Sequence, residues 1–225
     1  MSDPLLRPVW SMLTGPQAHL ALGDGDALRI DPRYGPFAAL RDGADAASLA
    51  AIVKPGEQVW LVELGERPAP AGFTTVRVAT LVQMVAEQPA PMLPGDDVAA
   101  LLGEGDAAAM SEIALATKPG PWGERTRLYG GFYGIRNGAR LAAMAGERMR
   151  PAAGIAELSG VCTWPDYRGQ GLAGKLIRRV MAGFTARGDV PILHSYAANT
   201  GANVLYESLG FKTRREMVVT VLERG

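Results

Sequence analysis

The stretch YRGQGLAGKL, residues 167–176, contains three glycines, two cations and two leucines within ten positions. Gly169, Gly171 and Gly174 follow the spacing G-x-G-x-x-G, the fingerprint of dinucleotide-binding folds. A glycine-rich turn that leads into a helix offers free backbone N–H groups to an anion, and the helix dipole adds about half a positive charge there. Arg168 adds a cation. The stretch predicts a cradle for pyrophosphate, with an ordinary glycine-rich turn as the alternative.

The surroundings of this loop do not fit NAD. A dinucleotide fold places its glycines directly at the end of a strand and early in the domain. Here residues 165–168 separate Gly169 from the strand before it, and only 56 residues follow. A dinucleotide fold also needs an acidic residue about 20 positions later, at the end of the next strand. Asp189 lies at that distance, but it precedes the next strand instead of following it. No GK[ST] closes the motif, so a nucleotide-triphosphate loop is excluded as well.

The composition narrows the class of protein. The chain has 225 residues, is 48% hydrophobic, and carries 23 Lys plus Arg against 23 Asp plus Glu. Balanced charge gives no general reason to expect a nucleic-acid or membrane partner. The single Cys162 rules out an intrachain disulfide, and two histidines, His19 and His194, argue against a metal site. The sequence shows no signal peptide and no membrane-length apolar run, so we expect a cytoplasmic protein.

A proline-rich segment predicts a division into two parts. Residues 86–97, AEQPAPMLPGDD, contain three prolines and a glycine, which prevent regular structure. We therefore expect an N-terminal α/β unit over residues 1–90 and a second domain over residues 97–225. The first unit holds a predicted helix at 45–53 and predicted strands at 58–64 and 73–85, the latter turning helical at its end. It carries no concentrated chemical motif, so we expect a structural role.

The second part has a sharper pattern. Asn137-Gly138 is a strong hairpin signal between two apolar strands. Leu172, Leu176, Val180 and Phe184 recur every four residues and predict a core-facing helical stripe. The expected elements are a helix at 106–117 capped by Asp106, strands at 127–136, 139–150 and 154–165, the glycine loop and its helix, a strand at 191–197, a short helix from Asn199 to Gly210, and a strand at 216–223.

Two motifs resemble one family. Residues 168–173, RGQGLA, fit R-x-x-G-x-A, which is similar to the acyl-CoA pyrophosphate motif of the GNAT superfamily of N-acyltransferases. Residues 199–211, NTGANVLYESLGF, resemble its second signature, N-x-x-A-x-x-x-Y-x-x-x-G-F. The resemblance covers about residues 97–225 and is strongest to bacterial proteins related to glycine N-acyltransferases. The N-terminal unit only weakly resembles a degenerate half of the same fold.

The resemblance implies a fold and an activity. The fold would be α/β (α+β), with a mixed central sheet flanked by helices and a smaller N-terminal α/β unit. The activity would be acetyl-CoA-dependent N-acetyl transfer, in which the acyl group passes directly from the thioester to a primary amine of a small molecule or peptide. The protein would be a monomer or homodimer. A non-catalytic acyl-CoA-binding or sensing protein is the alternative, which the presence of Glu157 and Tyr206 disfavours.

The resemblance also implies which residues bind acetyl-CoA. The strand before the loop would bulge, with Gly160 as a suitable place, and would offer backbone amides to the pantetheine arm and the acyl carbonyl. Direct transfer needs no thiol nucleophile, so Cys162 would serve as a small apolar residue of that strand. Asn199 would contact CoA or cap its helix. The expected cofactor-binding residues are Val161, Cys162, Thr163, Arg168, Gly169, Gln170, Gly171, Leu172, Ala173 and Asn199.

The expected catalytic residues are Tyr206 and Glu157. Tyr206 matches the family's general acid, although its place on an apolar helix face is also consistent with core packing. Glu157 would be a base with a raised pKa, or a solvent-facing or ion-paired strand residue. His194 is a second candidate for the base or a satisfied core histidine, and water is a further candidate. Glu147 or Arg148 would orient the acceptor or form a solvated strand end, and residues 117–127 would form the acceptor lip.

Overall fold

The protein is described here by a computed structural model that covers residues 3–225. The helices are α1 (Pro8–Thr14), α2 (Ala107–Thr117), α3 (Leu172–Ala186) and α4 (Thr200–Ser208). The strands are β1 (Ala21–Leu22), β2 (Ala27–Ile30), β3 (Phe37–Leu40), β4 (Gln58–Glu63), β5 (Phe73–Val85), β6 (Ala100–Leu101), β7 (Phe132–Asn137), β8 (Arg140–Glu147), β9 (Ile155–Thr163), β10 (Val190–Tyr196) and β11 (Lys212–Arg224). Short 3-10 helices cover Pro4–Leu6, Ala18–Leu20, Ala46–Ala51, Asp96–Val98, Glu104–Asp106, Thr126–Leu128 and Pro165–Tyr167.

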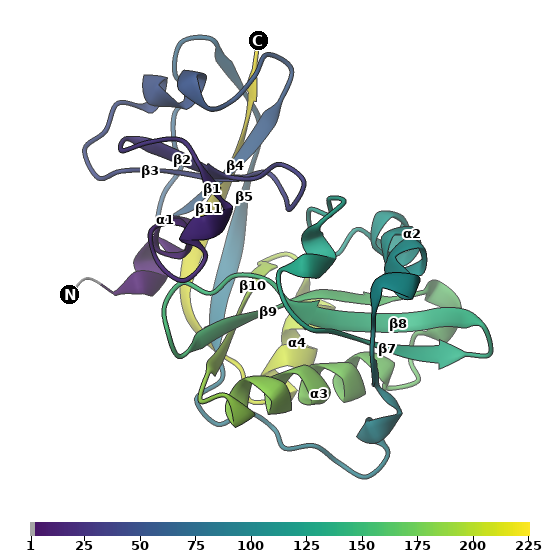
Figure 1. Ribbon diagram of the computed structural model, residues 1–225. Coiled ribbons are helices and arrows are strands. Elements are labelled where there is room, and N and C mark those ends of the chain that lie inside the picture. The colour runs from purple at the N-terminus through teal and green to yellow at the C-terminus, as the bar shows by residue number, and fades with distance from the viewer. Residues whose placement is uncertain (1–2) are drawn as a thin grey trace.

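All of these strands belong to one mixed sheet. Its order is β1-β2-β3-β4-β11-β5-β10-β9-β8-β7-β6. The β3–β4 and β9–β10 pairs are parallel, whereas β11 runs antiparallel to both β4 and β5. Figure 1 shows β5 and β11 as two long ribbons that connect the N-terminal elements to the rest of the molecule. The parts expected over residues 1–90 and 97–225 therefore share a sheet, and the domain division stays a prediction.

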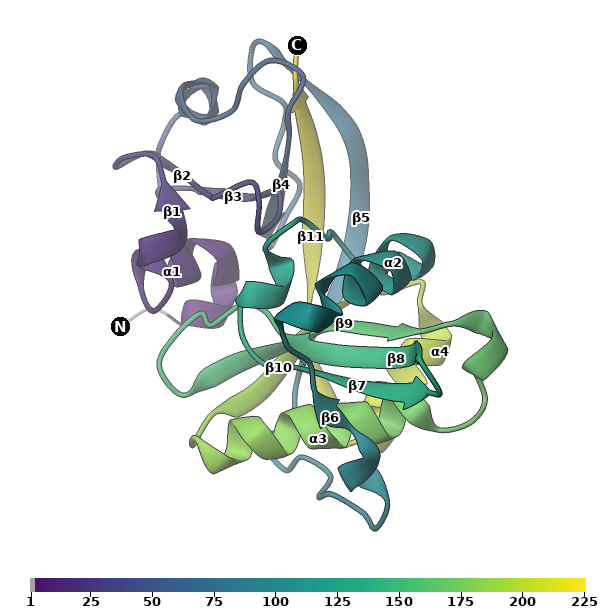
Figure 2. The same cartoon turned by 45° about the vertical axis from the view of Figure 1, so that its right-hand side comes forward.

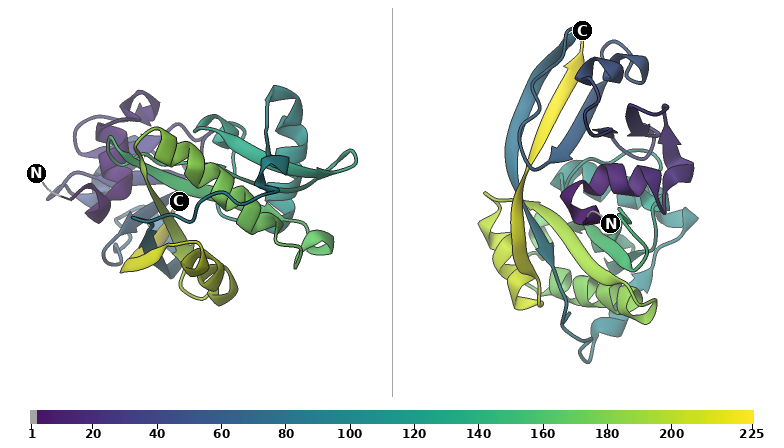
Figure 3. Two further views of the ribbon diagram at one scale, coloured as in Figure 1. Left: turned by 90° about the horizontal axis from the view of Figure 1, so that it is seen from below. Right: turned by 90° about the vertical axis from the view of Figure 1, so that its left-hand side faces the viewer.

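Two helices cover opposite faces of the C-terminal strands. In Figure 2, α3 lies below β7 and β8 while α2 lies above them, and the view from below in Figure 3 shows α3 lying along the strands that it covers. The predicted stripe of α3 buries Leu176, Val180 and Phe184. Each such side chain contributes about 1.5–3 kcal/mol by its burial. Because both faces are covered, β8 is buried over nearly its whole length.

The structure corrects three local expectations. The segment predicted as a helix at 45–53 is a 3-10 helix, Ala46–Ala51, whose first turn is capped by the Asp45 side chain on the Ala47 N–H. The strand β5 stays extended to Val85 and does not turn helical. Asp106 accepts from the Gly103 N–H at 2.7 Å and makes no side-chain cap bond to α2. The Asn137-Gly138 hairpin between β7 and β8 is confirmed.

The N-terminal elements share a hydrophobic cluster with β11 and with Tyr129 and Met149 of the C-terminal part. Phe37, Val62, Leu81 and Val219 are among its buried members and come from β3, β4, β5 and β11. Helix α1 contributes Val9, Met12 and Leu13. The short strands β1, β2 and β3 were not predicted from the sequence. No helix among residues 3–225 has the length and apolar character needed to cross a membrane.

Candidate active site

A bulge interrupts β9 at the place expected from the sequence. Gly160 has a φ of +61°, and the register with β8 shifts between the pairs Met144↔Cys162 and Gly146↔Ser159. A Cβ at Gly160 would lie 2.7 Å from Cε1 of Phe132, so only glycine fits there. The expected bulge at Gly160 is confirmed, and it changes the direction of the strand just before Val161.

The strands β9 and β10 separate after Glu157, just before the bulge. Their parallel pairing runs from Val190↔Ile155 to Ile192↔Glu157, and no later pair joins the two strands within residues 3–225. On the other edge of β9, the Trp164 N–H donates to the Ala142 carbonyl at 3.1 Å. Backbone N–H groups alternate in direction along a strand. The N–H groups of Val161 and Thr163 therefore face the opened side, as the resemblance implies for a pantetheine-binding strand.

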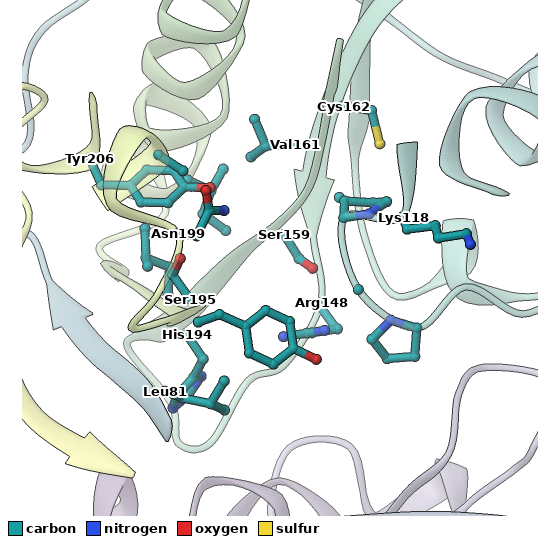
Figure 4. Close-up of a pocket in the computed structure, with 18 of the residues that line it drawn as sticks. Leu81, Lys118, Arg148, Ser159, Val161, Cys162, His194, Ser195, Asn199 and Tyr206 are labelled. Atoms are coloured by element: carbon teal, nitrogen blue, oxygen red, sulfur yellow. The ribbon is translucent and has the colours of Figure 1, made fainter. Parts of the chain in front are cut away.

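A cavity of about 710 Å³ occupies the opening between the two strands. Figure 4 shows Val161, Ser159, Arg148, His194 and Tyr206 arranged around it. The predicted residues that line it are Val161, Cys162, Thr163, Arg168, Ala173, Asn199 and Tyr206. The remaining predicted residues, Gly169, Gln170, Gly171, Leu172 and Glu157, are not part of its lining.

The glycine loop forms an open helix N-terminus beside this cavity. Gly171 has a φ of +73°, which requires glycine, and directly precedes the first residue of α3. It provides no side-chain cap, so the first N–H groups of α3, which include that of Ala173, are left for an external acceptor. Gly169 and Gln170 are exposed in the same loop. The Arg168 Nε donates to the Thr163 carbonyl at 3.3 Å, which links the loop to β9.

Tyr206 and Cys162 are neutral groups on the walls of this cavity. Tyr206 packs edge-on against Phe211, with 6.1 Å between the ring centroids, so it is both a packing residue and a lining residue. Burial, together with nearby Cys162, raises the pKa of Tyr206 to about 12. Burial also raises the pKa of the Cys162 thiol to about 12. Both groups therefore stay protonated at neutral pH.

Asn199 precedes α4 without capping it through its side chain. The structure shows no side-chain bond from Asn199 to the first turn, and its carbonyl accepts from the Asn203 N–H at 3.0 Å. The capping interpretation of this side chain is therefore wrong. The exposed Asn199 side chain lies at the rim of the cavity.

Glu157 departs from the expectation of a raised pKa. It is fully buried and accepts from Arg148 through two bonds, Nε to Oε2 at 2.9 Å and Nη2 to Oε1 at 2.8 Å. Burial alone would raise the pKa of this carboxyl, but the charge and hydrogen bonds of Arg148 and a bond from His194 hold it well below the usual range. The prediction of a raised pKa is wrong. The ion-paired interpretation of Glu157 is confirmed.

His194 is held by hydrogen bonds at both ring nitrogens. Its Nδ1 lies 2.8 Å from Oε1 of Glu157, and its Nε2 lies 2.9 Å from Nε2 of Gln83. A carboxylate can only accept, so Nδ1 carries the proton and Nε2 accepts from the amide of Gln83. The same amide donates to the Leu5 carbonyl at 2.9 Å, which supports its orientation. Neither ring nitrogen is left free for a substrate.

No sequence motif indicated that the N-terminal part lines the site. Phe37, Trp60 and Leu81 belong to the unit expected to be only structural, yet they line the cavity. All three lie far before the loop motif in the sequence. The pairing of β11 with β4 and β5 brings Phe37 and Trp60 to the site, whereas Leu81 lies on β5, which pairs directly with β10. Arg148, expected to be an acceptor-orienting or solvated residue, is buried and lines the cavity as well. No group of three or more His, Cys, Asp or Glu among residues 3–225 is arranged to hold a metal ion.

Comparison with known proteins agrees with this architecture. A family model, FR47-like protein, matches residues 132–219. The chain is 53% identical to a protein from Novosphingobium aromaticivorans that is assigned to the GNAT family of acetyltransferases, and its crystal structure superposes with a TM-score of 0.96 over 100% of both chains. The comparison with curated proteins found no match.

More distant structures share the fold. A GCN5-related N-acetyltransferase from Kribbella flavida is 19% identical, with a TM-score of 0.58 over 96% of this chain and 92% of the other. One from Sphaerobacter thermophilus is 16% identical, with a TM-score of 0.53 over 88% and 77%. Together with the 53% identical relative, the opened strand pair and the helix N-terminus identify an acyltransferase enzyme. The chain belongs to the GNAT family of acetyltransferases, and the expected fold is confirmed.

Proposed function

We propose that this protein is an N-acetyltransferase that moves the acetyl group of acetyl-CoA directly to a primary amine. The observation that carries the proposal is a single cavity bounded by the opened edge of β9, Ala173 at the N-terminal end of α3, and Tyr206 of α4. A pyrophosphate acceptor, strand amides and a proton donor are the parts that thioester transfer requires.

Acetyl-CoA would bind along the N-terminus of α3 and the edge of β9. The pyrophosphate would accept from the N–H groups of residues 169–174, with Arg168 as the adjacent cation. The pantetheine arm would follow β9, using the N–H groups of Val161 and Thr163, and Asn199 would contact the arm from the opposite side. An amide donor to the developing oxyanion contributes on the order of 3 kcal/mol.

The transfer would proceed through attack of a neutral amine on the thioester carbon. A C–N bond forms, the C–S bond breaks, and the sulfur leaves with a proton from the Tyr206 hydroxyl. The tyrosinate recovers a proton from solvent. Because Glu157 is buried and both nitrogens of His194 are engaged, we propose that water takes the amine proton. Glu157 would then act as a positioning residue that holds Arg148.

The experiment is a screen of primary amines with acetyl-CoA, with detection of released thiol. The panel contains amino acids, polyamines, aminoglycosides and peptides. Amine-dependent thiol release, together with an acetylated product by mass spectrometry, supports the proposal. Tight acetyl-CoA binding by calorimetry without thiol release on any amine would instead identify an acyl-CoA-binding protein without turnover. Absence of both would remove acetyl-CoA from the assignment.

A further inference from the structure

The charges on the cavity wall all have one sign. Lys118, Arg148 and Arg168 are the charged side chains among its lining residues, and no Asp or Glu of residues 3–225 lines it. Arg168 belongs to the glycine loop, whereas Arg148 follows the end of β8 and lies against Phe37 of β3. A polycationic acceptor would find no countercharge here. An acceptor that carries a negative group would find cations to bind.

Arg148 has one guanidinium nitrogen that its ion pair does not use. Nε and Nη2 donate to Glu157, and Nη1 has no acceptor among residues 3–225. The side chain is 10% exposed and lines the cavity. A Cβ placed on Gly120, another lining residue, would lie 3.7 Å from Nη1, so this nitrogen is next to the segment 117–121.

The guanidinium of Arg148 is held rigidly in this position. Two bonds to Glu157 fix one edge, and the Phe37 ring lies 4.9 Å from the guanidinium carbon on its face. A fixed, directed N–H donor binds a carboxylate with little loss of side-chain entropy. The free Nη1 is therefore suited to one carboxylate oxygen of a ligand.

An apolar wall lies beside Arg148. Phe37, Trp60, Val62, Leu81 and Val219 line this part of the cavity. These residues come from β3, β4, β5 and β11, so this wall is distinct from β9, along which acetyl-CoA is proposed to bind. Trp60 also contacts Phe37 edge-on, with 6.3 Å between centroids. Such a wall binds an aliphatic or aromatic group by removing it from water.

Arg77, an exposed residue of β5, contacts two residues at the rim of this wall, Trp60 and Tyr196. Its guanidinium carbon lies 4.9 Å from the Trp60 ring centroid and 5.2 Å from that of Tyr196. Its Nη2 also donates to the Tyr196 hydroxyl at 2.7 Å. Trp60 and Tyr196 both line the cavity, so the rim is fixed before a ligand enters.

We propose that the acceptor is a small amine that carries a carboxylate and an apolar side group, such as an apolar amino acid. Its carboxylate accepts from Nη1 of Arg148, its side group packs on Phe37, Trp60 and Leu81, and its amine faces the opened edge of β9. The proposal rests on the proposed acetyl transfer: the amine nitrogen gains the acetyl group and releases a proton, and CoA leaves as the thiol.

The first test compares matched acceptors on the wild-type enzyme. Phenylalanine and phenylalaninamide differ only in the carboxylate, alanine lacks the large side group, and spermidine carries only positive charge. Rates are expressed per neutral amine, because amidation lowers the pKa of the amine. We expect kcat/KM for phenylalanine to exceed that for each of the other three by about tenfold or more. Equal use of phenylalaninamide, or better use of spermidine, overturns the proposal.

The second test uses two variants and a matched control. Arg148→Lys keeps a cation beside Glu157 but removes Nη1, so we expect KM for phenylalanine to rise about tenfold while KM for phenylalaninamide stays unchanged. Trp60→Ala should remove the preference for phenylalanine over alanine. Trp10→Ala is the control, because Trp10 packs against the same hydrophobic cluster outside the cavity lining. The same loss of preference in Trp10→Ala contradicts a role for the wall.

The outcomes separate this inference from the proposed function. If circular dichroism shows that Arg148→Lys does not fold, the comparison of acceptors on the wild-type enzyme and the Trp60→Ala variant still test the acceptor class. Acetyl-CoA turnover with phenylalaninamide or spermidine as the better acceptor rejects the acceptor class alone. No acetyl-CoA binding, and no thiol release with any amine, rejects the proposed acetyl transfer and the acceptor class together.

Discussion

Arg148 and Glu157 face each other between the end of β8 and the beginning of β9, joined by two hydrogen bonds of 2.9 and 2.8 Å in a buried setting. The Met149 N–H adds a third bond to the same carboxylate at 3.2 Å. Glu157 also forms the last pair that joins β9 to β10, so the ion pair lies where those two strands begin to separate. It also turns the free nitrogen of Arg148 toward the cavity.

We predict that this pair makes stability sensitive to acid. A carboxyl whose pKa is lowered by folding stabilises the protein above its unfolded pKa of about 4.3, and the contribution is lost as the pH falls through the lower folded pKa. Glu157→Gln should destabilise the protein at pH 7 by about 3 kcal/mol, because Arg148 loses its buried countercharge. The same variant should lose less stability than the wild type on acidification below about pH 4.

Chemical denaturation at several pH values measures this difference. Glu112→Gln serves as the control, because Glu112 is exposed on α2. Parallel loss of stability with acid in the wild type and in Glu157→Gln would show that the pair is not the acid-sensitive element.

We predict that Gly171→Asp weakens acetyl-CoA binding by about tenfold or more. Aspartate would bring a negative charge to the helix N-terminus and a β-carbon to a position with positive φ. Gly188→Asp is the matched control: Gly188 has a φ of +76° just after the other end of α3, with open space around it. Calorimetry should show weaker binding only for Gly171→Asp. Equal weakening in both variants would mean that backbone strain is responsible.

We predict that Tyr206→Phe slows the chemical step by about 10²- to 10⁴-fold and leaves acetyl-CoA affinity unchanged. The ring and its contact with Phe211 remain, and only the hydroxyl is lost. Single-turnover acetyl transfer is the measurement, because product release can hide a chemical defect in kcat. Tyr133→Phe is the control, a half-buried tyrosine packed on the core away from the cavity. A wild-type rate in Tyr206→Phe would make solvent the proton donor.

We predict that the acetyl-transfer rate shows no alkaline decline up to about pH 10. A general acid works while it is protonated, and burial raises the pKa of Tyr206 to about 12. The rate should instead rise with pH as the acceptor amine loses its proton, and then level off. Single-turnover rates from about pH 6 to about pH 10 test this profile. A falling limb centred below about pH 10 would show that the donor has an ordinary pKa or is another group.

The features that the sequence predicted well are local ones. The Asn137-Gly138 turn, the stripe on α3, the bulge at Gly160 and the loop around Gly171 each depend on residues within a few positions. The resemblance to the family also predicted that Val161, Arg168 and Tyr206 belong to one site, and all three line the cavity. Short strands such as β2 and β3 escaped prediction because four residues carry too little periodic pattern.

The features that the sequence did not predict depend on distant parts of the chain. The pKa of Glu157 is set by Arg148 and His194, which come from two neighbouring strands. Sequence position alone does not tell whether a strand glutamate meets such partners or solvent. The apolar wall at Phe37 and Trp60 has the same origin, because it exists only once β11 has joined the two halves of the sheet.

The position of β11 also bears on how the chain folds as it is translated. β11 follows every other strand in the sequence, yet it lies between β4 and β5, and β1–β4 reach the rest of the sheet only through it. On the ribosome, β4 is complete roughly 150 residues before β11 emerges, which at about 5–20 residues per second is on the order of ten seconds. Throughout that interval the edge of β4 that β11 later covers lacks its partner, so this edge stays open to incorrect strand pairing until the last strand of the sheet has been made.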